Sequence, residues 1–371
     1  MRALGHQTMV VAPDYGFEQG NDNGDILRVT SLSFPNLRFS IPLEFMDWTA
    51  IEEKVTSFNP DLIHAHHPFK LGKSALDLAD QLEVPLVYTY HTLYEFFTHY
   101  FLMDTEPVRK QVREYVVNFA NCCDQVITPT EPIRQHLIEM GVNTRTASIP
   151  TGIDFSRFDN IPAERIEQWR QKLNLARFDK ILFCAGRISR EKNLGLILHA
   201  LRALSDSGRN YGLVIAGKGP ARRPLQKEVA GLKLEDRVVW TGFVSQEELP
   251  ELYLLSDLFL FPSPSDTQGI VLYEAQAAGK PIVAVESMAS QAIVTDGKNG
   301  RFAKNDAADF AEKIKEVLDH PERFNAPFDR EAFSKESLGR RYEELYLELA
   351  SSGRSRKRKQ LGTIFFPFFN P

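Results

Sequence analysis

Two acidic residues, Asp266 and Glu274, lie seven residues apart in the stretch SPSDTQGIVLYEAQAAGKPIVAV. An apolar run stops at Pro262 just before this stretch, and another begins at Pro281. The pattern therefore predicts a strand, a polar loop, a helix, a turn and a second strand. If the helix begins near Gly269, the backbone amides at its N-terminus attract a phosphate or the hydroxyl oxygens of a sugar.

The amides at this helix start belong to Gln268, Gly269 and Ile270. Glu274 lies more than one turn further along, where its carboxylate can accept two hydrogen bonds from a diol such as ribose. In the alternative interpretation, Asp266 or Thr267 merely caps the helix and Glu274 is an exposed helix residue. The spacing alone leaves both interpretations open.

Two cations, Arg187 and Lys192, follow another predicted strand in the sequence KILFCAGRISREKN. They would lie at the carboxyl end of that strand, which is where α/β sheets bind ligands. Two fixed cations suit a diphosphate, because arginine offers a bidentate fork and lysine a point charge. The alternative is ordinary surface charge at the start of a helix.

The order of these segments resembles a known family. Acidic-x7-Glu ending in E-A-x-A-A-G-x-P, with G-R-x4-K-N ahead of it, is similar to the donor site of retaining GT-B glycosyltransferases of the glycogen-synthase-like family 4 type. That family usually has Glu where this chain has Asp266. The resemblance implies that Arg187 and Lys192 hold the donor diphosphate. It also implies that Asp266 and the amides at 268–270 hold the hexose and phosphate, and that Glu274 holds the ribose.

His91 ends the predicted strand PLVYTYH in the first half of the chain. In the family, a histidine in this Y/F-H-T context lies over the donor sugar. The resemblance therefore makes His91 a candidate catalytic residue, together with Arg187, Lys192 and Asp266. A purely structural histidine is the alternative.

The segment HAHHPF brings His64, His66 and His67 to the end of another strand. Such spacing can bind zinc, but no matching ligands appear at a consistent spacing elsewhere in the sequence. No D-x-D motif follows a suitable strand either. The sequence therefore predicts no metal and no cofactor, with the sugar nucleotide as substrate.

An aromatic stretch, YEFFTHYFLM, follows His91. Core packing of a helix is its simplest interpretation, yet H-T-x-Y-E-x-x-x-H-Y closely resembles the diacylglycerol glucosyltransferases. In that subgroup this region lies on the acceptor side, so Tyr94 and His99 become acceptor-side candidates. The T-Q-G variant of the donor motif also resembles glycolipid glucosyl- and mannosyltransferases.

The C-terminal tail carries five cations followed by aromatic residues within 354–369. A basic cluster gains about 1 kcal/mol per residue at an anionic membrane surface, and inserted aromatics add to this. The tail therefore predicts contact with a membrane surface, with a solvated terminus as the alternative.

The bulk composition is that of a globular protein. The chain has 371 residues, 43% of them hydrophobic and 25% charged, which favours two domains. A net charge of −5 argues against a nucleic-acid partner. Three cysteines without metal spacing, no apolar run near ~20 residues and no signal-peptide core predict a cytoplasmic protein. The tail would make it peripheral on the inner face of the cell membrane.

Strands alternate with helices along most of the chain, and this predicts parallel α/β sheets. We expect a GT-B fold of two Rossmann-like domains facing a cleft. The predicted layout is an acceptor-side domain at 1–158, a donor-binding domain at 159–328, a crossover helix at 329–350 and the tail at 351–371. By resemblance, the first domain lacks the family's first strand and Gly-rich loop.

The predicted reaction transfers glucose from UDP-glucose, with retention, to a lipid hydroxyl such as that of diacylglycerol. One alternative is a GDP-mannose-dependent α-mannosyltransferase. A second alternative, motivated by the shortened start, is a non-catalytic chain that binds a nucleotide or a membrane.

Overall fold

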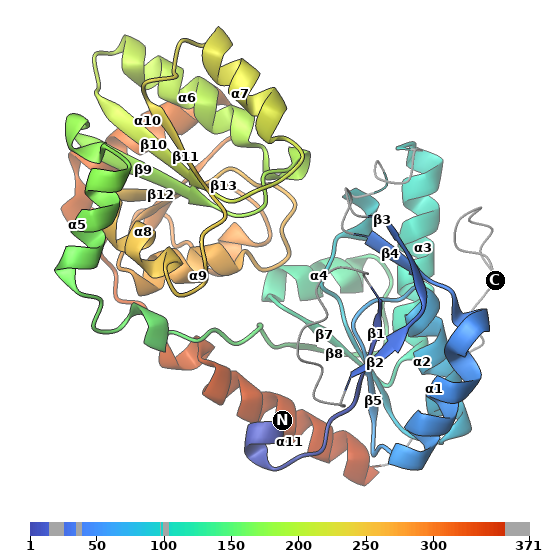
Figure 1. Cartoon of the computed structure of the whole chain (residues 1–371). Helices are drawn as coiled ribbons and strands as arrows, with labels where there is room; N and C mark the ends of the chain where they lie inside the picture. Colours follow the sequence, from blue (N-terminus) through green and yellow to red (C-terminus); the bar gives the residue numbers. More distant parts are fainter. Residues whose placement is uncertain (15–25, 35–38, 97, 99–103, 353–371) are drawn as a thin grey trace. The chain divides into compact units, whose positions relative to one another are not determined.

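The chain folds into two compact units in a computed structural model that describes residues 1–14, 26–34, 39–96, 98 and 104–352 (Figure 1). Unit 1 comprises Met1–Ile149 and the chain from Leu338 onwards, and unit 2 comprises Pro150–Ser337. His99 and the tail at 354–369 lie outside the described residues.

Unit 2 is built on six parallel strands in the order β11-β10-β9-β12-β13-β14 (Figure 1). The predicted alternation of strands and helices is confirmed. The strands are β9 (Lys180–Ala185), β10 (Tyr211–Ala216), β11 (Val238–Gly242), β12 (Leu258–Phe261), β13 (Ile282–Val285) and β14 (Gly300–Ala303). The helices are α5 (Ala163–Lys172), α6 (Leu194–Asp206), α7 (Arg222–Gly231), α8 (Leu249–Leu255), α9 (Ile270–Ala277) and α10 (Ala307–Asp319).

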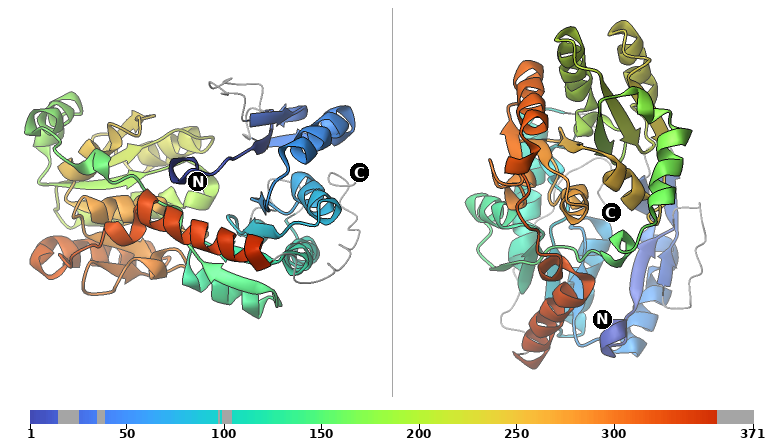
Figure 2. Two further views of the ribbon diagram at one scale, coloured as in Figure 1. Left: turned by 90° about the horizontal axis from the view of Figure 1, so that it is seen from below. Right: turned by 90° about the vertical axis from the view of Figure 1, so that its left-hand side faces the viewer.

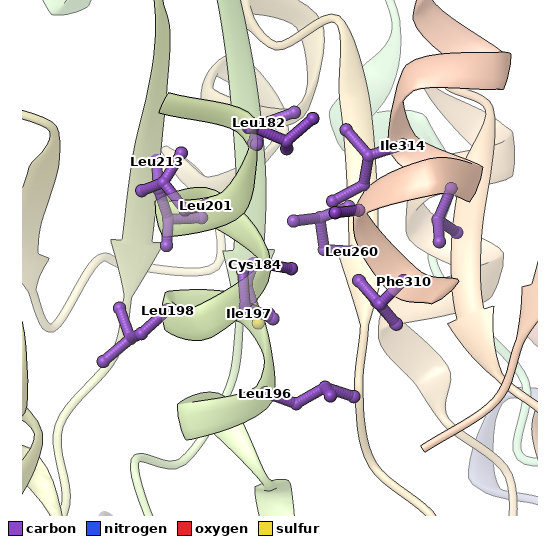
Figure 3. Packing of buried hydrophobic residues seen from close by; sticks show 14 of the residues in the cluster. Leu182, Cys184, Leu196, Ile197, Leu198, Leu201, Leu213, Leu260, Phe310 and Ile314 are labelled. Carbon is purple, nitrogen blue, oxygen red and sulfur yellow. The ribbon is translucent and has the colours of Figure 1, made fainter. Parts of the chain in front are cut away.

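Successive residues of each central strand face opposite sides of this sheet, because strand side chains alternate with a period of two. In β9, Leu182 and Cys184 join the core under α6, α7 and α10 (Figure 3). Ile181 and Phe183 join the other core, under α5, α8 and α9. Burial on both faces explains why the strands read as continuous apolar runs rather than alternating ones.

The strand order reverses direction between β9 and β12. From β9 the chain passes through α6 to β10 on one side, whereas from β12 it passes through α9 to β13 on the other. The connections that follow β9 and β12 therefore leave the carboxyl edge of the sheet toward opposite sides. This is the topological switch point at which open α/β sheets bind ligands.

Unit 1 contains a parallel sheet in the order β5-β6-β7-β8, a parallel pair β1-β2 and an antiparallel pair β3-β4. Its strands are β1 (Val10–Pro13), β2 (Ile26–Val29), β3 (Ser31–Phe34), β4 (Phe39–Pro42), β5 (Ile63–Ala65), β6 (Leu86–Thr89), β7 (Gln125–Thr128) and β8 (Arg145–Ser148). Its helices are α1 (Glu44–Phe58), α2 (Lys70–Gln81), α3 (Glu106–Cys122) and α4 (Glu131–Glu139). The predicted strand PLVYTYH corresponds to β6, and the predicted strand that ends at HAHHPF corresponds to β5.

The long helix near the C-terminus, α11 (Lys335–Ser352), begins later than the predicted residue 329 (Figure 2). Residues Glu331–Phe333 form a separate 3-10 turn, and the hydroxyl of Ser334 then accepts a hydrogen bond from the Ser337 amide at 3.1 Å. From Leu338, the helix packs in a core with Val87 of β6 and neighbouring strand residues.

The division between the units falls at Ile149 rather than at residue 158. The segment after it belongs to unit 2 because Ile153, Phe155 and Phe158 are buried in that unit's core. Likewise unit 2 extends to Ser337 rather than 328.

His64 of β5 ties α11 to the sheet of unit 1. Its Nδ1 lies 2.5 Å from the Tyr346 hydroxyl and its Nε2 lies 2.7 Å from the Thr89 hydroxyl. Burial lowers the pKa of His64 well below 6.5, and the neighbouring His66 and His91 lower it further. The unfolded chain therefore binds a proton at a higher pH than the folded chain does, and acid favours unfolding.

We predict that the Tyr346→Phe substitution lowers the free energy of unfolding by about 1 kcal/mol, because one ring nitrogen of His64 loses its partner. Tyr115→Phe of α3 is the matched control, since its hydroxyl donates to the Pro68 carbonyl at 2.9 Å. We also expect the wild-type melting temperature to fall as the pH drops below about 6.5. Urea unfolding measures the free energy of unfolding, and thermal unfolding at different pH values measures the melting temperature. Equal stability of the wild type, Tyr346→Phe and the control variant would contradict the predicted loss of unfolding free energy.

Candidate functional site

Lys192 and Asp266, which are 74 residues apart in sequence, meet at the carboxyl edge of the unit 2 sheet. The Lys192 Nζ lies 2.5 Å from the Asp266 Oδ1. Lys192 ends a 3-10 turn after β9, and Asp266 lies in the loop after β12, which pairs directly with β9. Their side chains are 30% and 20% exposed, so the pair is partly shielded from solvent yet reachable by a ligand. The structure thus brings together two residues that the sequence predicted to act together.

Hydrogen bonds from side chains of each loop to backbone carbonyls of the other hold this ion pair in place. The Asn193 side-chain amide donates to the Pro262 carbonyl at 3.2 Å, and the Ser263 hydroxyl donates to the Glu191 carbonyl at 3.4 Å. Arg187 precedes these residues in the loop after β9 and is half-buried. The two predicted diphosphate ligands therefore belong to one loop that is anchored to its neighbour.

The glycine-rich turn after β10 also supports this edge of the sheet. Gly217 has φ 144°, and a Cβ at this position would lie 1.9 Å from the carbonyl oxygen of Gly186. Because that oxygen belongs to the backbone, it cannot move aside as a flexible side chain would. The glycine thus allows the loops after β9 and β10 to touch.

Helix α9 begins at Ile270, with Gly269 as its N-cap residue in the left-handed conformation at φ 64°. The predicted helix start near Gly269 is confirmed. As a glycine, the N-cap residue Gly269 offers no side chain to cap this N-terminus, and the Asp266 carboxylate contacts Lys192. Glu274 is only 3% exposed, so the alternative interpretation of an exposed helix residue is wrong.

Two side chains that the sequence did not single out bind the Glu274 carboxylate. Arg157 donates from Nη2 to Oε1 at 2.5 Å, and the Tyr253 hydroxyl donates to Oε2 at 2.8 Å. Burial raises the pKa of Glu274, whereas the Tyr253 hydrogen bond and the Arg157 charge lower it. Arg157 lies in SIPTGIDFSRF, well outside both motifs, and no local pattern in the sequence links it to Glu274.

The side chain of Gln268 has a role of its own. Its Oε1 accepts a hydrogen bond from the Thr151 amide at 2.9 Å, and its Nε2 donates to the Thr151 carbonyl at 3.1 Å. Gln268 is 6% exposed, so both bonds are shielded from water. The sequence predicted only a backbone role for this residue. The structure adds a clamp between the α9 loop and the first residues of unit 2.

The histidines of unit 1 gather at the carboxyl ends of β5 and β6. The Nδ1 of His66 lies 3.0 Å from the Nε2 of His91, and their rings stack with centroids 5.2 Å apart. Burial, followed by the charge of His66, lowers the pKa of His91 to about 4, so its ring is neutral at pH 7. A neutral ring can accept or donate a hydrogen bond at a sugar hydroxyl. The catalytic role of His91 stays a prediction.

Tyr94 lies in the 3-10 turn Tyr94–Phe96 and packs edge-to-face against Phe69 and Tyr90, at 5.1 and 5.9 Å between ring centroids. These contacts agree with the core-packing interpretation of the aromatic stretch. Phe96, next to it, is 49% exposed. The acceptor-side role of Tyr94 and His99 stays a prediction.

Within the described ranges, no group of three or more His, Cys, Asp or Glu side chains could hold a metal ion. Both ring nitrogens of His64 are already hydrogen-bonded to hydroxyls. All three cysteines are buried, and burial raises the pKa of Cys184 to about 12. Among the helices in the described part of the chain, none combines the length and apolar character needed to cross a bilayer.

Comparison with known proteins identifies relatives for both halves of the chain. Residues 1–157 match the family Glycosyltransferase Family 4, and residues 165–334 match Glycosyl transferases group 1. An alpha-monoglucosyldiacylglycerol synthase of Streptococcus pneumoniae is 29% identical over 344 residues, covering 91% of this chain and 77% of that protein. A GDP-mannose-dependent alpha-mannosyltransferase of Corynebacterium glutamicum is 28% identical over 321 residues, covering 85% and 72%.

The fold has a counterpart among solved structures. The crystal structure of Anabaena HepE in complex with UDP and glucose superposes with a TM-score of 0.71 at 20% identity, covering 92% of this chain and 100% of that one. The two family matches extend over both units, and the parallel sheets are those of the same fold. The chain therefore belongs to the GT-B glycosyltransferases of the family 4 type.

Proposed function

We propose that this glycosyltransferase transfers glucose from UDP-glucose, with retention, to the hydroxyl of a lipid such as diacylglycerol. The observation that carries the proposal is the Lys192–Asp266 pair at the switch point of unit 2, beside the start of α9. A cation and an anion side by side suit the two parts of a sugar nucleotide. Lys192 would bind a phosphate, and Asp266 would accept hydrogen bonds from hexose hydroxyls.

In this proposal the donor needs no metal. Arg187 and Lys192 neutralise the diphosphate as it leaves, and the amides at 268–270 add hydrogen bonds at the start of α9. The bond between the sugar C1 and the phosphate oxygen breaks while a bond from C1 to the acceptor oxygen forms on the same face. The acceptor proton passes to the leaving phosphate oxygen. No carboxylate nucleophile is required.

The relatives support the choice of substrates. One is named an alpha-monoglucosyldiacylglycerol synthase, and HepE binds UDP and glucose in its crystal. The proposed assignment of His91 to the hexose and of Tyr94 and His99 to the acceptor follows the sequence resemblance. A GDP-mannose-dependent α-mannosyltransferase remains the second candidate, because one relative carries that name.

The lipid acceptor implies a membrane surface, and the tail at 354–369 supplies cations and aromatics for it. We propose that this tail holds the enzyme at the inner face of the cell membrane. Attraction to anionic lipids would concentrate the enzyme where its acceptor lies.

We predict that Lys192→Met lowers kcat for UDP-glucose turnover by about 10²–10³-fold, since one stabilising charge on the leaving diphosphate is lost. Glu274→Gln should raise the donor KM by about tenfold, because an amide accepts fewer hydrogen bonds from a diol. Release of UDP measures both. Lys180→Met is the matched control, since Lys180 pairs with Asp257 at 3.1 Å at the start of β9. Unchanged turnover in both site variants would overturn the assignment.

We predict that UDP-glucose binds at least about tenfold tighter than GDP-mannose, which corresponds to about 1.4 kcal/mol. Isothermal titration with each sugar nucleotide, followed by competition between them, measures the difference. Tighter binding of GDP-mannose would favour the mannosyltransferase. Absence of binding and turnover with either would favour the non-catalytic alternative.

We predict that deleting residues 353–371 weakens binding to phosphatidylglycerol vesicles by on the order of 10³-fold, because five cations each contribute about 1 kcal/mol. The deletion leaves α11, which ends at Ser352, intact. Flotation with phosphatidylcholine vesicles is the control, and added salt should mimic the deletion. Equal flotation of the two proteins would reject the role of the tail.

A further inference from the structure

Arg157 occupies an unusual place in unit 2. It lies in the 3-10 turn Ser156–Phe158, close to the first residue of that unit, yet its guanidinium reaches the acidic-x7-Glu motif 117 residues later. Its side chain is 19% exposed, and the carboxylate side chain that it contacts is 4% exposed. A shielded arginine–carboxylate pair is oriented far more strongly than an exposed one.

The hydrogen bonds of Glu274 leave acceptor positions on its carboxylate unused. An ionised carboxylate offers about four acceptor positions on its two oxygens. Arg157 uses one position on Oε1, and Tyr253 uses one on Oε2. One position therefore remains on each oxygen, which is the number that a vicinal diol requires. Because the Glu274 side chain is only 4% exposed, its carboxylate can bind a diol only when the two hydroxyls approach in one fixed orientation.

The same guanidinium also reaches a second loop. Its Nη1 donates to the side-chain oxygen of Gln246, which lies in the loop between β11 and α8. Ser245 in turn hydrogen-bonds Glu248 at the start of α8 at 2.9 Å. Arg157 thus joins the loop after β11 to α9 through a single side chain.

We propose that Arg157 is a positioning residue for the donor nucleoside. Its guanidinium holds the Glu274 carboxylate and the loop that contains Gln246 in one arrangement. This inference rests on the proposed function, because it needs a ribose at Glu274. It adds a residue outside the acidic-x7-Glu and G-R-x4-K-N motifs. Arg157 acts through Glu274 and Gln246, whereas these residues face the nucleoside.

Removal of Arg157 has a specific electrostatic consequence. The groups that act on Glu274 are Arg157 and Tyr253, and burial already raises the pKa of Glu274. Without the arginine charge, the pKa rises further and Glu274 becomes protonated at a higher pH. A protonated carboxyl cannot accept from both hydroxyls of a diol. Binding should therefore be weak at low pH and recover as the pH rises.

The experiment measures the Kd of UDP by isothermal titration between pH 6 and 9. We expect Arg157→Met to raise the Kd at least tenfold at pH 7, with recovery toward the wild-type value at pH 9. Arg157→Lys should restore most of the affinity and the flat pH profile, since the cation returns. In a Glu274→Gln background, Arg157→Met should add no pH dependence, because the titrating group is gone.

The matched control is Arg165→Met. Arg165 forms an ion pair with Glu251, a carboxylate that is 3% exposed and lies outside the proposed site. This variant leaves a buried carboxylate in the same unit without its cation, while Trp169 still donates to it at 2.7 Å, so it reproduces a general loss of stability. We expect its Kd for UDP to stay within twofold of wild type at every pH.

The outcomes separate the inference from the proposed function. Wild-type affinity of Arg157→Met at every pH, with normal binding by the wild type, would overturn the positioning role alone. Equal weakening of both arginine variants would also overturn it, since a structural effect would then explain the loss. Failure of the wild type to bind UDP at all would overturn both proposals.

Discussion

The parallel pairing of β9 with β12 is the constraint on which the proposed donor site depends. It brings the loop after β9 and the loop after β12 to one edge of the sheet, so that Lys192 and Asp266 meet at 2.5 Å. Helices cover both faces of this sheet, and alternate residues of β9 enter two different cores. A shift of β9 by one residue in its pairing with β12 would move every β9 side chain into the opposite core. Because burial prevents such a shift, the positions of the loops after both strands are fixed as well.

Burial determines which ion pairs of unit 2 interact most strongly. Glu274, at 3% exposure, is bound on both oxygens, and a change in either partner alters its ionisation. The Lys192–Asp266 pair is more open, which suits a site that exchanges an internal partner for a ligand. More exposed pairs, such as Arg145–Glu348 with both side chains more than half exposed, contribute little by comparison.

The first residues of unit 2 are part of its site. Thr151 is bound by the Gln268 side chain, and Arg157 binds Glu274, so this segment contacts the acidic-x7-Glu motif near both of its ends. Between these contacts, Phe155 is buried in the same core as α9. This segment thus packs directly against the residues of the proposed donor site. Replacement of this segment would therefore alter the site as well as the connection to unit 1.

The sequence by itself determined the alternation of strands and helices in unit 2, the start of α9 at Gly269 and the residues that follow β9 and β12. These features depend on local patterns, namely apolar runs, turn residues and spacing. Only the tertiary structure decided that Glu274 is buried, that Arg157 and Tyr253 are its partners, and that Gln268 clamps Thr151. Those contacts join residues far apart in sequence, and packing rather than any local pattern brings them together.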